Sequence, residues 1–274
     1  MTSTTEYIDS DGYVRTRVNR TRRLLGQIAV YGGAALILGA IWWGAARIFD
    51  TALLFPGPFE TLERLWALSS TLLENTGASM ARVGIGFLAG GLLGATLGLG
   101  MGYSRRVRYF FTPYVDFFRF IPVFAWFGPI LVWIGAGNVS IVLLIVYTSV
   151  WVVAINTLAG CVRVGPDAWR MISIYRPSRL QEITRLLFPA VLPYILGGMR
   201  LAIGSAFMTV VAAEFLQANE GLGALLSRFQ MFYDMPGVFA TIICLGLLGI
   251  LVDQLFVLVT RLLAARYLPN GRLA

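Results

Sequence analysis

The chain has 274 residues, of which 57% are hydrophobic and only 13% charged, and its formal net charge is +8. An ordinary soluble domain carries about 25% charged residues, so a soluble globular protein is excluded. The positive charge does not indicate nucleic-acid binding, because the basic residues alternate with apolar stretches instead of forming one patch. All 22 basic residues are arginine, and without histidine the chain has no imidazole for a proton relay or a metal site.

Six long apolar stretches dominate the sequence. Each approaches or exceeds the roughly 20 residues that a helix needs to cross a bilayer. They span residues 25–48, 83–103, 113–134, 139–161, 190–216 and 236–262. The sequence therefore predicts an all-α polytopic membrane protein with six transmembrane helices, made of a cytoplasmic tail (residues 1–23) and a single transmembrane domain (residues 24–274).

The arginines are distributed unequally between the two sides of these stretches. If the N-terminus is cytoplasmic, the inside segments hold most of the arginines, in the tail and within residues 105–108, 163–185 and 261–272. The outside segments hold Arg64, Arg82 and Arg228 and are richer in acidic residues. Because arginine accumulates in cytoplasmic loops, both termini are predicted to be cytoplasmic.

Two segments between the spans are predicted to be structured. Pro58–Glu74 places leucines three and four residues apart, which is typical of an amphipathic helix at the outer surface. Residues 162–188 form the longest cytoplasmic loop and carry five arginines. Short connections suffice for packing, so a loop of about 25 residues indicates a function.

The second and third stretches have distinctive compositions. Glycines of the second stretch recur four residues apart at Gly86, Gly90 and Gly94, a small-residue pattern that lets helices approach closely in lipid. The third stretch combines three prolines with many aromatic residues, among them Phe124 and Trp126. Broken backbone at membrane depth is tolerated only against protein or a water-filled cavity, so these two aromatic residues are candidates for the lining of a pathway.

Three ionisable residues of the last two stretches are candidate functional residues. Arg200 and Asp253 lie at similar depth near mid-membrane on antiparallel spans, which favours a structural ion pair. The alternative is that Arg200 contacts an anionic substrate. Glu214 lies close to the outer end of its span, where gating, contact with a partner, capping and packing remain open. An intramembrane charge costs at least about 2.5 kcal/mol, so each should face protein or water.

No catalytic or metal-binding constellation is present in the sequence. The two cysteines, Cys161 and Cys244, are far apart in the chain and read as small apolar residues. No Gly-x-x-x-x-Gly-Lys-Ser/Thr phosphate-binding loop is present. The chain is therefore not expected to be an enzyme or to bind a cofactor, and any ATP-driven step requires a separate subunit.

The cytoplasmic loop resembles that of permease subunits of bacterial ABC importers with the type I fold. Their loop reads Glu-Ala-Ala, three residues, Gly, nine residues, then Ile-x-Leu-Pro. Here Pro189 supplies the proline, which puts Arg176 at the glycine and Arg170-Met171-Ile172 at the Glu-Ala-Ala positions. The spacing is retained but the signature residues are not. These four residues, Pro189 and Asp167 are the candidate ATPase-coupling residues.

A second resemblance covers residues 50 to 265. Pro189-Ala-Val-Leu-Pro193 and the Gly197-Gly-Met-Arg200 that follows, together with Ala212-Ala-Glu214 and Gly221-Leu-Gly223, are similar to the nitrate/sulfonate/taurine branch of these permeases. The resemblance implies a type I permease fold in the bacterial inner membrane and a pathway for a small anionic solute. It also implies a second permease subunit, two ATPase subunits that bind ATP and Mg²⁺, and an extracytoplasmic solute-binding protein.

Three points remain open in the sequence. The altered loop favours a specialised ATPase partner, with an acidic groove that complements Arg170. A homodimer of this permease is preferred over a heterodimer with a second permease that keeps the ordinary loop. Because arginine lacks the freedom of glycine, the bend at Arg176 is expected to be made differently, with Pro177. The alternatives to an ATP-driven importer are an ion-coupled secondary transporter and a structural membrane anchor; the sequence shows no inverted repeat that would favour the former.

Overall fold

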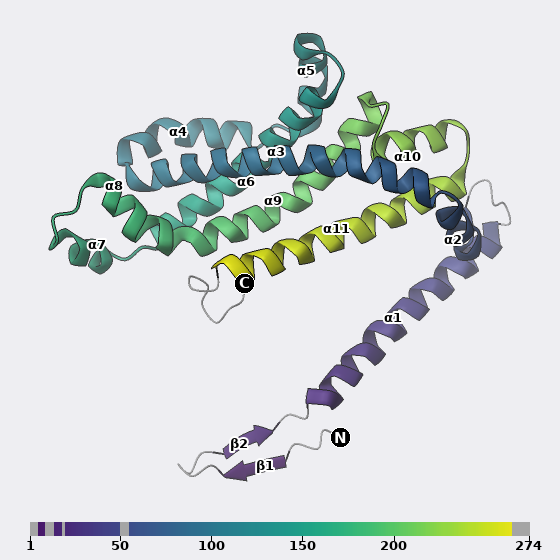
Figure 1. The fold of residues 1–274 in the computed structure, drawn as a ribbon, viewed down its shortest axis with the longest axis horizontal. Helices are drawn as coiled ribbons and strands as arrows, with labels where there is room; N and C mark the ends of the chain where they lie inside the picture. The colour runs from purple at the N-terminus through teal and green to yellow at the C-terminus, as the bar shows by residue number, and fades with distance from the viewer. Residues whose placement is uncertain (1–4, 9–13, 18–19, 50–54, 265–274) are drawn as a thin grey trace. The chain divides into compact units, whose positions relative to one another are not determined.

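The computed structural model describes residues 5–8, 14–17, 20–49 and 55–264. The chain divides into two compact units, one up to Glu63 and one from Arg64 onward, and each is described separately. Figure 1 shows the elements of both units.

The first unit contains a small hairpin and one long helix. Strands β1 (Thr5–Ile8) and β2 (Val14–Arg17) pair antiparallel, an addition to the expected all-α architecture. Helix α1 (Arg20–Phe49) contains the whole first apolar stretch. The indole nitrogen of Trp42 donates to the carbonyl of Pro56 at 3.1 Å, which ties α1 to the turn that follows it.

The second apolar stretch lies in a longer helix than expected. Helix α2 ends at Ala67 (Pro58–Ala67), and α3 (Ser69–Tyr103) then begins immediately. The amphipathic helix that was predicted over residues 58–74 therefore ends at Ala67, and Glu74 belongs to α3. The apolar segment 83–103 forms only the later part of α3, because the polar segment before it continues the same helix.

The remaining elements follow in the order shown in Figure 1. They are α4 (Arg105–Phe118), the 3₁₀ turn η1 (Val123–Trp126), α5 (Phe127–Ile134), α6 (Asn138–Val162), α7 (Pro166–Ser173), α8 (Arg179–Glu182), the π-helical turn η2 (Ile183–Leu187), α9 (Phe188–Gln217), α10 (Leu222–Met231) and α11 (Met235–Ala264). Figure 1 shows α3, α6 and α9 side by side, with α7 and α8 at one end of this group and α10 at the other.

A stripe of glycines holds α3 directly against α6. A methyl group added at any of them would meet atoms of α6: Ile145 at Gly86, Ser149 and Val146 at Gly90, Val150 and Val153 at Gly94, Ala154 and Thr157 at Gly98, and Cys161 at Gly102. The five glycines recur every fourth residue and therefore share one helix face. The predicted close-approach pattern thus extends along most of α3, and its partner is α6.

The main apolar core lies between α3, α6 and α9. Ile141, Leu144 and Ile145 of α6 are fully buried there, as is Ala206 of α9. Phe127, the first residue of α5, packs against the same cluster. The core therefore joins the three long helices to the start of the short one.

The expected third span, residues 113–134, is not a single helix. Helix α4 begins earlier, at Arg105, and continues through Pro113 to Phe118. The chain then breaks and resumes as η1 and α5, bent by 89°. Pro122 explains the break, because proline disfavours helical backbone in the residue before it. The tyrosine hydroxyl of Tyr147 secures the broken segment by donating to the carbonyl of Phe118 at 2.6 Å.

The described residues contain four single helices that are long and apolar enough to cross a membrane, and the bent α4–α5 pair is a fifth candidate. The prediction of an all-α polytopic membrane protein is confirmed, while the count of six spans stays a prediction.

Candidate functional sites in the loop of α7 and α8 and in the helix bundle

The predicted ATPase-coupling loop forms two short helices. Helix α7 begins with Pro166 at its first turn, where a missing N–H costs nothing. Ser178 precedes α8 and caps it through a capping box with Gln181. The loop is fastened to the end of α3, because the hydroxyl of Tyr103 donates to Glu182 at 2.7 Å. The indole of Trp169 lies beside the Tyr103 ring. The loop therefore has a fixed base on the bundle.

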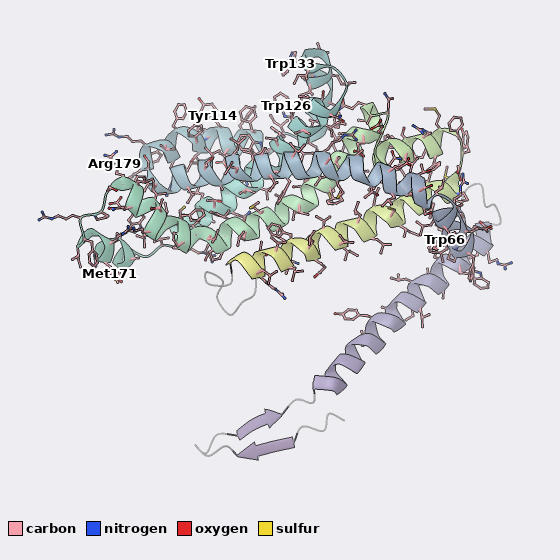
Figure 2. All side chains as sticks on the ribbon, viewed as in Figure 1. Trp66, Tyr114, Trp126, Trp133, Met171 and Arg179 are labelled. Carbon is pink, nitrogen blue, oxygen red and sulfur yellow. The ribbon has the colours of Figure 1, made fainter. Side chains whose placement is uncertain are left out.

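The candidate coupling residues occupy different surfaces of this loop. Asp167 and Arg170 form a largely exposed pair at 3.3 Å, which contributes little by itself. Met171 and Arg179 protrude at this end of the bundle, as Figure 2 shows. Ile172 helps to line a hollow of about 590 Å³, whose complete lining is Ala168, Met171, Ile172, Tyr175, Pro177, Gln181, Arg185 and Leu186. Pro189 lies outside the hollow, in the first turn of α9.

Arg176 makes the bend between the two short helices. Its φ is +46°, a left-handed backbone conformation that glycine adopts easily and arginine rarely. The expectation that the bend would be made differently was wrong: Arg176 keeps the conformation that suits a glycine, at a cost in strain. Pro177 follows it and lines the hollow.

We predict that Arg176→Gly stabilises the loop. Removing the side chain relieves left-handed strain of about 1 kcal/mol, which the greater chain entropy of glycine partly offsets. The measurement is amide hydrogen exchange of residues 166–187 in the purified protein, which should slow down. Arg179→Gly is the control, because it places glycine in the first turn of α8 and should accelerate exchange. Faster exchange in Arg176→Gly would contradict the assignment of strain.

Arg200 and Asp253 form a forked ion pair between α9 and α11. The Nε and Nη2 atoms of Arg200 donate to the two carboxylate oxygens of Asp253, each at 2.9 Å. The two side chains are 36% and 30% exposed, respectively. Two parallel charge-assisted hydrogen bonds hold the guanidinium in one orientation. The geometry thus matches the ion pair expected from the sequence, and the part-exposure leaves substrate contact open as a hypothesis.

We predict that Arg200 and Asp253 are energetically coupled. Alanine at either position should lower the free energy of unfolding by about 1–3 kcal/mol, because the other charge loses its partner within the bundle. The double variant should be milder than the sum of the two. Thermal unfolding of the purified variants in detergent provides the measurement. If Arg200→Ala remains stable but loses transport and Asp253→Ala has no effect, Arg200 contacts the substrate instead.

Glu214 is the centre of a buried polar cluster at the α9–α10 end of the bundle. Its carboxylate is fully buried and accepts from Arg82 Nη1 at 2.5 Å, from Ser79 Oγ at 2.8 Å and from the Gly223 amide at 3.1 Å. The hydroxyl of Ser79 also accepts from the Leu222 amide at 2.9 Å. The α9–α10 turn is thereby fastened to α3.

Arg82 extends the cluster to two further segments. Its Nε donates to Asn138 at the start of α6 at 2.7 Å, and its Nη1 also donates to the Glu220 carbonyl at 2.8 Å. Sequence reasoning placed Arg82 among the outside arginines and missed this role. The spacing of Asn75, Ser79 and Arg82 was the available signal, because it puts three polar side chains on one face of α3, and Asn75 indeed accepts from the Gly221 amide.

Phe124 and Trp126 lie at the bend after α4. Phe124 is exposed on the described surface, whereas Trp126 is half-buried against Phe118 and Tyr147. Figure 2 shows Trp126 where α4 gives way to α5. Its indole nitrogen is buried and has no hydrogen-bond partner among the described residues. The two candidate pathway residues therefore mark the broken segment, and Trp126 packs against the main apolar core.

The described residues thus form a helical bundle with a bent helix pair, a loop of two short helices fixed to one end and charged residues paired within the bundle. The chain matches the family described as "Binding-protein-dependent transport system inner membrane component" over residues 86–264. It therefore belongs to this family and is the permease subunit of a binding-protein-dependent ABC importer, a multi-pass protein of the inner membrane.

Several relatives match over most of their length. A probable ABC transporter permease protein of Brucella melitensis biotype 1 is 33% identical over 206 residues, which cover 74% of this chain and 84% of the relative. The taurine transport system permease protein TauC of Escherichia coli (strain K12) is 30% identical over 83% of this chain and 86% of its own. The nitrate import permease protein NrtB of Synechocystis sp. is 29% identical over 73% and 76%.

Solved structures share the fold at low sequence identity. A chain of the MetNI methionine ABC transporter in an inward-facing conformation has a TM-score of 0.62 at 14% identity, covering 71% of this chain and 97% of that chain. A chain of a bacterial ABC transporter involved in alginate import has a TM-score of 0.61 at 15% identity, covering 89% and 99%. These likenesses identify the type I ABC importer permease fold.

Proposed function

We propose that the chain is one of two identical permease subunits that import a small oxyanion, driven by two ATPase subunits in the cytoplasm. The oxyanion class is supported by the printed functions of the taurine and nitrate permeases to which the chain is similar. Both termini are cytoplasmic in this arrangement, and an extracytoplasmic solute-binding protein delivers the solute from the outside. Catalysis, ATP and Mg²⁺ belong to the ATPase subunits.

The loop of α7 and α8 is the proposed ATPase-docking element, and it is the observation on which the proposal chiefly rests. Met171, Ile174 and Tyr175 are exposed apolar side chains beside a hollow at this end of the bundle. An exposed apolar patch rimmed by arginines is typical of a surface that binds a protein. Arg170 favours an ATPase groove with an acidic residue opposite it.

The loop is also connected so that a force on it reaches the spans. The π-helical turn η2 joins α8 directly to α9, and Leu187 within it is fully buried. Tyr103 and Glu182 connect the same segment to α3. A movement of α7 and α8 with the ATPase would therefore act on two long helices at once. Arg200 lies further along the same α9 and pairs with Asp253 of α11, and this pair either stiffens the bundle or faces the solute.

The experiment that tests this proposal begins with purification of the tagged permease from its native host. We expect an ATPase subunit to co-purify, and the mass of the complex to correspond to two permease and two ATPase chains. Reconstituted with its binding protein, the complex should import labelled taurine or nitrate only when ATP is present inside the vesicle. Uptake driven by an ion gradient without ATP would support a secondary transporter, and an ATPase with no uptake of any solute would support a structural anchor.

Loop variants locate the docking surface within the same assay. Replacing Arg170, Met171 and Ile172 by glutamate should abolish ATPase retention and uptake. Arg106→Glu is the matched control, because Arg106 is an exposed arginine in the α3–α4 region and lies outside the loop. Undiminished ATPase retention in the triple variant would refute the docking assignment, and a second, non-identical permease at equal stoichiometry would refute the homodimer.

A further inference from the structure

Helix α4 carries a continuous polar stripe along its whole length. The members of the stripe follow one another at steps of three or four residues: Arg105, Arg108, Thr112, Asp116 and, at the residue that caps the helix, Arg119. Residues at this spacing share one face of a helix. The stripe therefore extends for about 21 Å, at the rise of a regular α-helix.

The two other faces of α4 are apolar. One of them faces the bundle, where Val115 is buried and Val107 lies beside Gly100 of α3. The other face carries exposed aromatic side chains, among them Tyr114 and Phe117. Figure 2 shows Tyr114 on the side of α4 that points away from α3. Polar and apolar residues are thus segregated around this helix.

Helix α4 runs along the bundle instead of lying across its end, as Figure 1 shows. At its start, Arg108 donates to the carbonyls of Met101 at 3.0 Å and Gly102 at 3.3 Å, in the last turn of α3. At its end, the Phe118 carbonyl accepts from Tyr147, which lies near the centre of α6. The polar stripe therefore reaches from one end of the bundle to its middle.

The deep part of the stripe is exposed on the single chain. Thr112 is exposed. The side chains of Asp116 and Arg119 are 54% and 40% exposed, although they pair with each other at 3.2 Å. A charge in the hydrocarbon core costs at least about 2.5 kcal/mol, so such residues face protein or a water-filled cavity instead of lipid. The aromatic face of α4 has no such restriction, and only the polar face requires polar surroundings.

We propose that the polar stripe of α4 lines the water-filled inner half of the solute pathway. The assignment rests on the proposed import function and names the part of the chain that forms this wall. The stripe begins at Arg105, which is exposed at the end of the bundle where α7 and α8 lie. Water that hydrates Arg105 can therefore follow the stripe inward to Arg119. Three arginines against one aspartate make the wall positive, which attracts an anionic solute.

The first test maps water along α4 with single cysteines. After both native cysteines are replaced by alanine, Thr112→Cys reports on the polar face, and Tyr114→Cys and Phe117→Cys are the matched controls on the aromatic face. Inverted membrane vesicles that contain the whole complex are treated with the charged thiol reagent MTSES, which does not cross membranes. Thr112→Cys should react at least about tenfold faster than the controls. The reason is that apolar surroundings raise the pKa of a thiol, and each pKa unit lowers the thiolate fraction tenfold.

A deeper reporter tests whether water reaches the middle of the bundle. The variant Asp116→Cys/Arg119→Gln removes both charges of the pair, so that neither is left alone, and its cysteine should react as fast as Thr112→Cys. ATP-driven uptake by the alanine background and by Thr112→Cys checks that the complex is intact. Equal reactivity of the polar and aromatic faces refutes the proposal, because the stripe then meets protein or the whole helix lies in water. An unreactive Asp116→Cys/Arg119→Gln refutes it as well.

The second test distinguishes a pathway from a permanent crevice. A transporter with alternating access opens its pathway to one side at a time, so the inner half must close during the ATP cycle. Trapping the complex with ATP and orthovanadate should slow the reaction of Thr112→Cys about tenfold, since closure returns the thiol to apolar surroundings. Arg106→Cys is the control, because Arg106 is exposed in the first turn of α4 and lies outside the stripe. A rate at Thr112→Cys that ATP and orthovanadate do not change refutes the pathway assignment.

The outcomes separate this inference from the proposed function. If the unaltered complex imports its solute with ATP, but Thr112→Cys is no more reactive than Phe117→Cys, the stripe does not line the pathway and the importer stands. If the unaltered complex shows no ATP-driven uptake of any solute, the proposed function fails, and the pathway assignment fails with it even where Thr112→Cys reacts selectively.

Discussion

Leucine at Gly94 is expected to prevent α3 from packing on α6, whereas leucine at Gly84 is expected to be tolerated. A methyl group at Gly94 would meet the Val150 carbonyl oxygen at 2.5 Å and the Val153 Cβ at 2.9 Å. One of these atoms is backbone and cannot rotate away, so the helices must separate. Gly84 lies on the same helix with no atom within 4 Å of an added methyl group.

The series should be graded by size. Gly94→Ala is expected to lower the free energy of unfolding by about 1–3 kcal/mol, the usual penalty for an overpacked site. Gly94→Leu is expected to lower it further, so that the purified protein is no longer monodisperse. Gly84→Ala and Gly84→Leu should be neutral or slightly stabilising, since both residues favour helix over glycine. The measurements are thermal unfolding in detergent and the size-exclusion profile. Equal behaviour of the Gly84 and Gly94 variants would contradict the close packing of α3 on α6.

The glycine stripe illustrates what a sequence alone predicts about this fold. Gly86, Gly90 and Gly94 predict that α3 has a close helical neighbour, because their spacing puts them on one face. The pattern does not identify that neighbour. Ile145, Ser149 and Val153 of α6 face the stripe, but in the sequence they belong to an apolar run with no distinguishing periodicity. Tertiary packing decides which helix packs against the glycine stripe.

The contacts of the charged residues could also be predicted only in part from the sequence. Arg200 and Asp253 could be paired from the sequence, because they are opposite charges at one depth on neighbouring spans. Glu214 was recognised as a candidate, but its partner Arg82 was assigned to the outer surface because it directly precedes the apolar segment that begins at residue 83. Helix α3 begins well before that segment, so Arg82 is carried into the bundle by polar residues that hydropathy reads as a loop.

The bend of the third span was only half predictable. Proline and aromatic residues indicated interrupted backbone, and Pro122 does interrupt it. The start of α4 at Arg105 was not predicted. The three arginines of residues 105–108 lower the hydropathy there and indicated a cytoplasmic loop, but in the structure they form the first turn of the helix. Arg119 directly follows the last residue of this helix. The observed helix places it about 21 Å along its axis from Arg105, at the rise of a regular α-helix.

Removing either charge of the Arg82–Glu214 pair is expected to be among the most destabilising changes outside the glycine stripe. Glu214 is fully buried and Arg82 nearly so. Breaking such a pair leaves an uncompensated charge and costs about 3–5 kcal/mol. Replacing Glu214 should also destabilise the α9–α10 turn, because its carboxylate accepts a hydrogen bond from the Gly223 amide. Thermal unfolding of Glu214→Ala and Arg82→Ala in detergent provides the measurement.

A more exposed pair supplies the matched control. Arg64 contacts Asp234 at the same 2.5 Å separation, but its side chain is 41% exposed, so Arg64→Ala should cost no more than about 1 kcal/mol. The double variant Arg82→Met/Glu214→Met should be less destabilised than either single alanine variant, since no charge is then left buried and the volume is largely retained. Single variants no worse than Arg64→Ala would show that water reaches the cluster and that the turn is held by its backbone contacts. A double variant as unstable as the sum of the singles would show that Ser79 and Asn138, left without their charged partners, contribute as much to the fold as the ion pair itself.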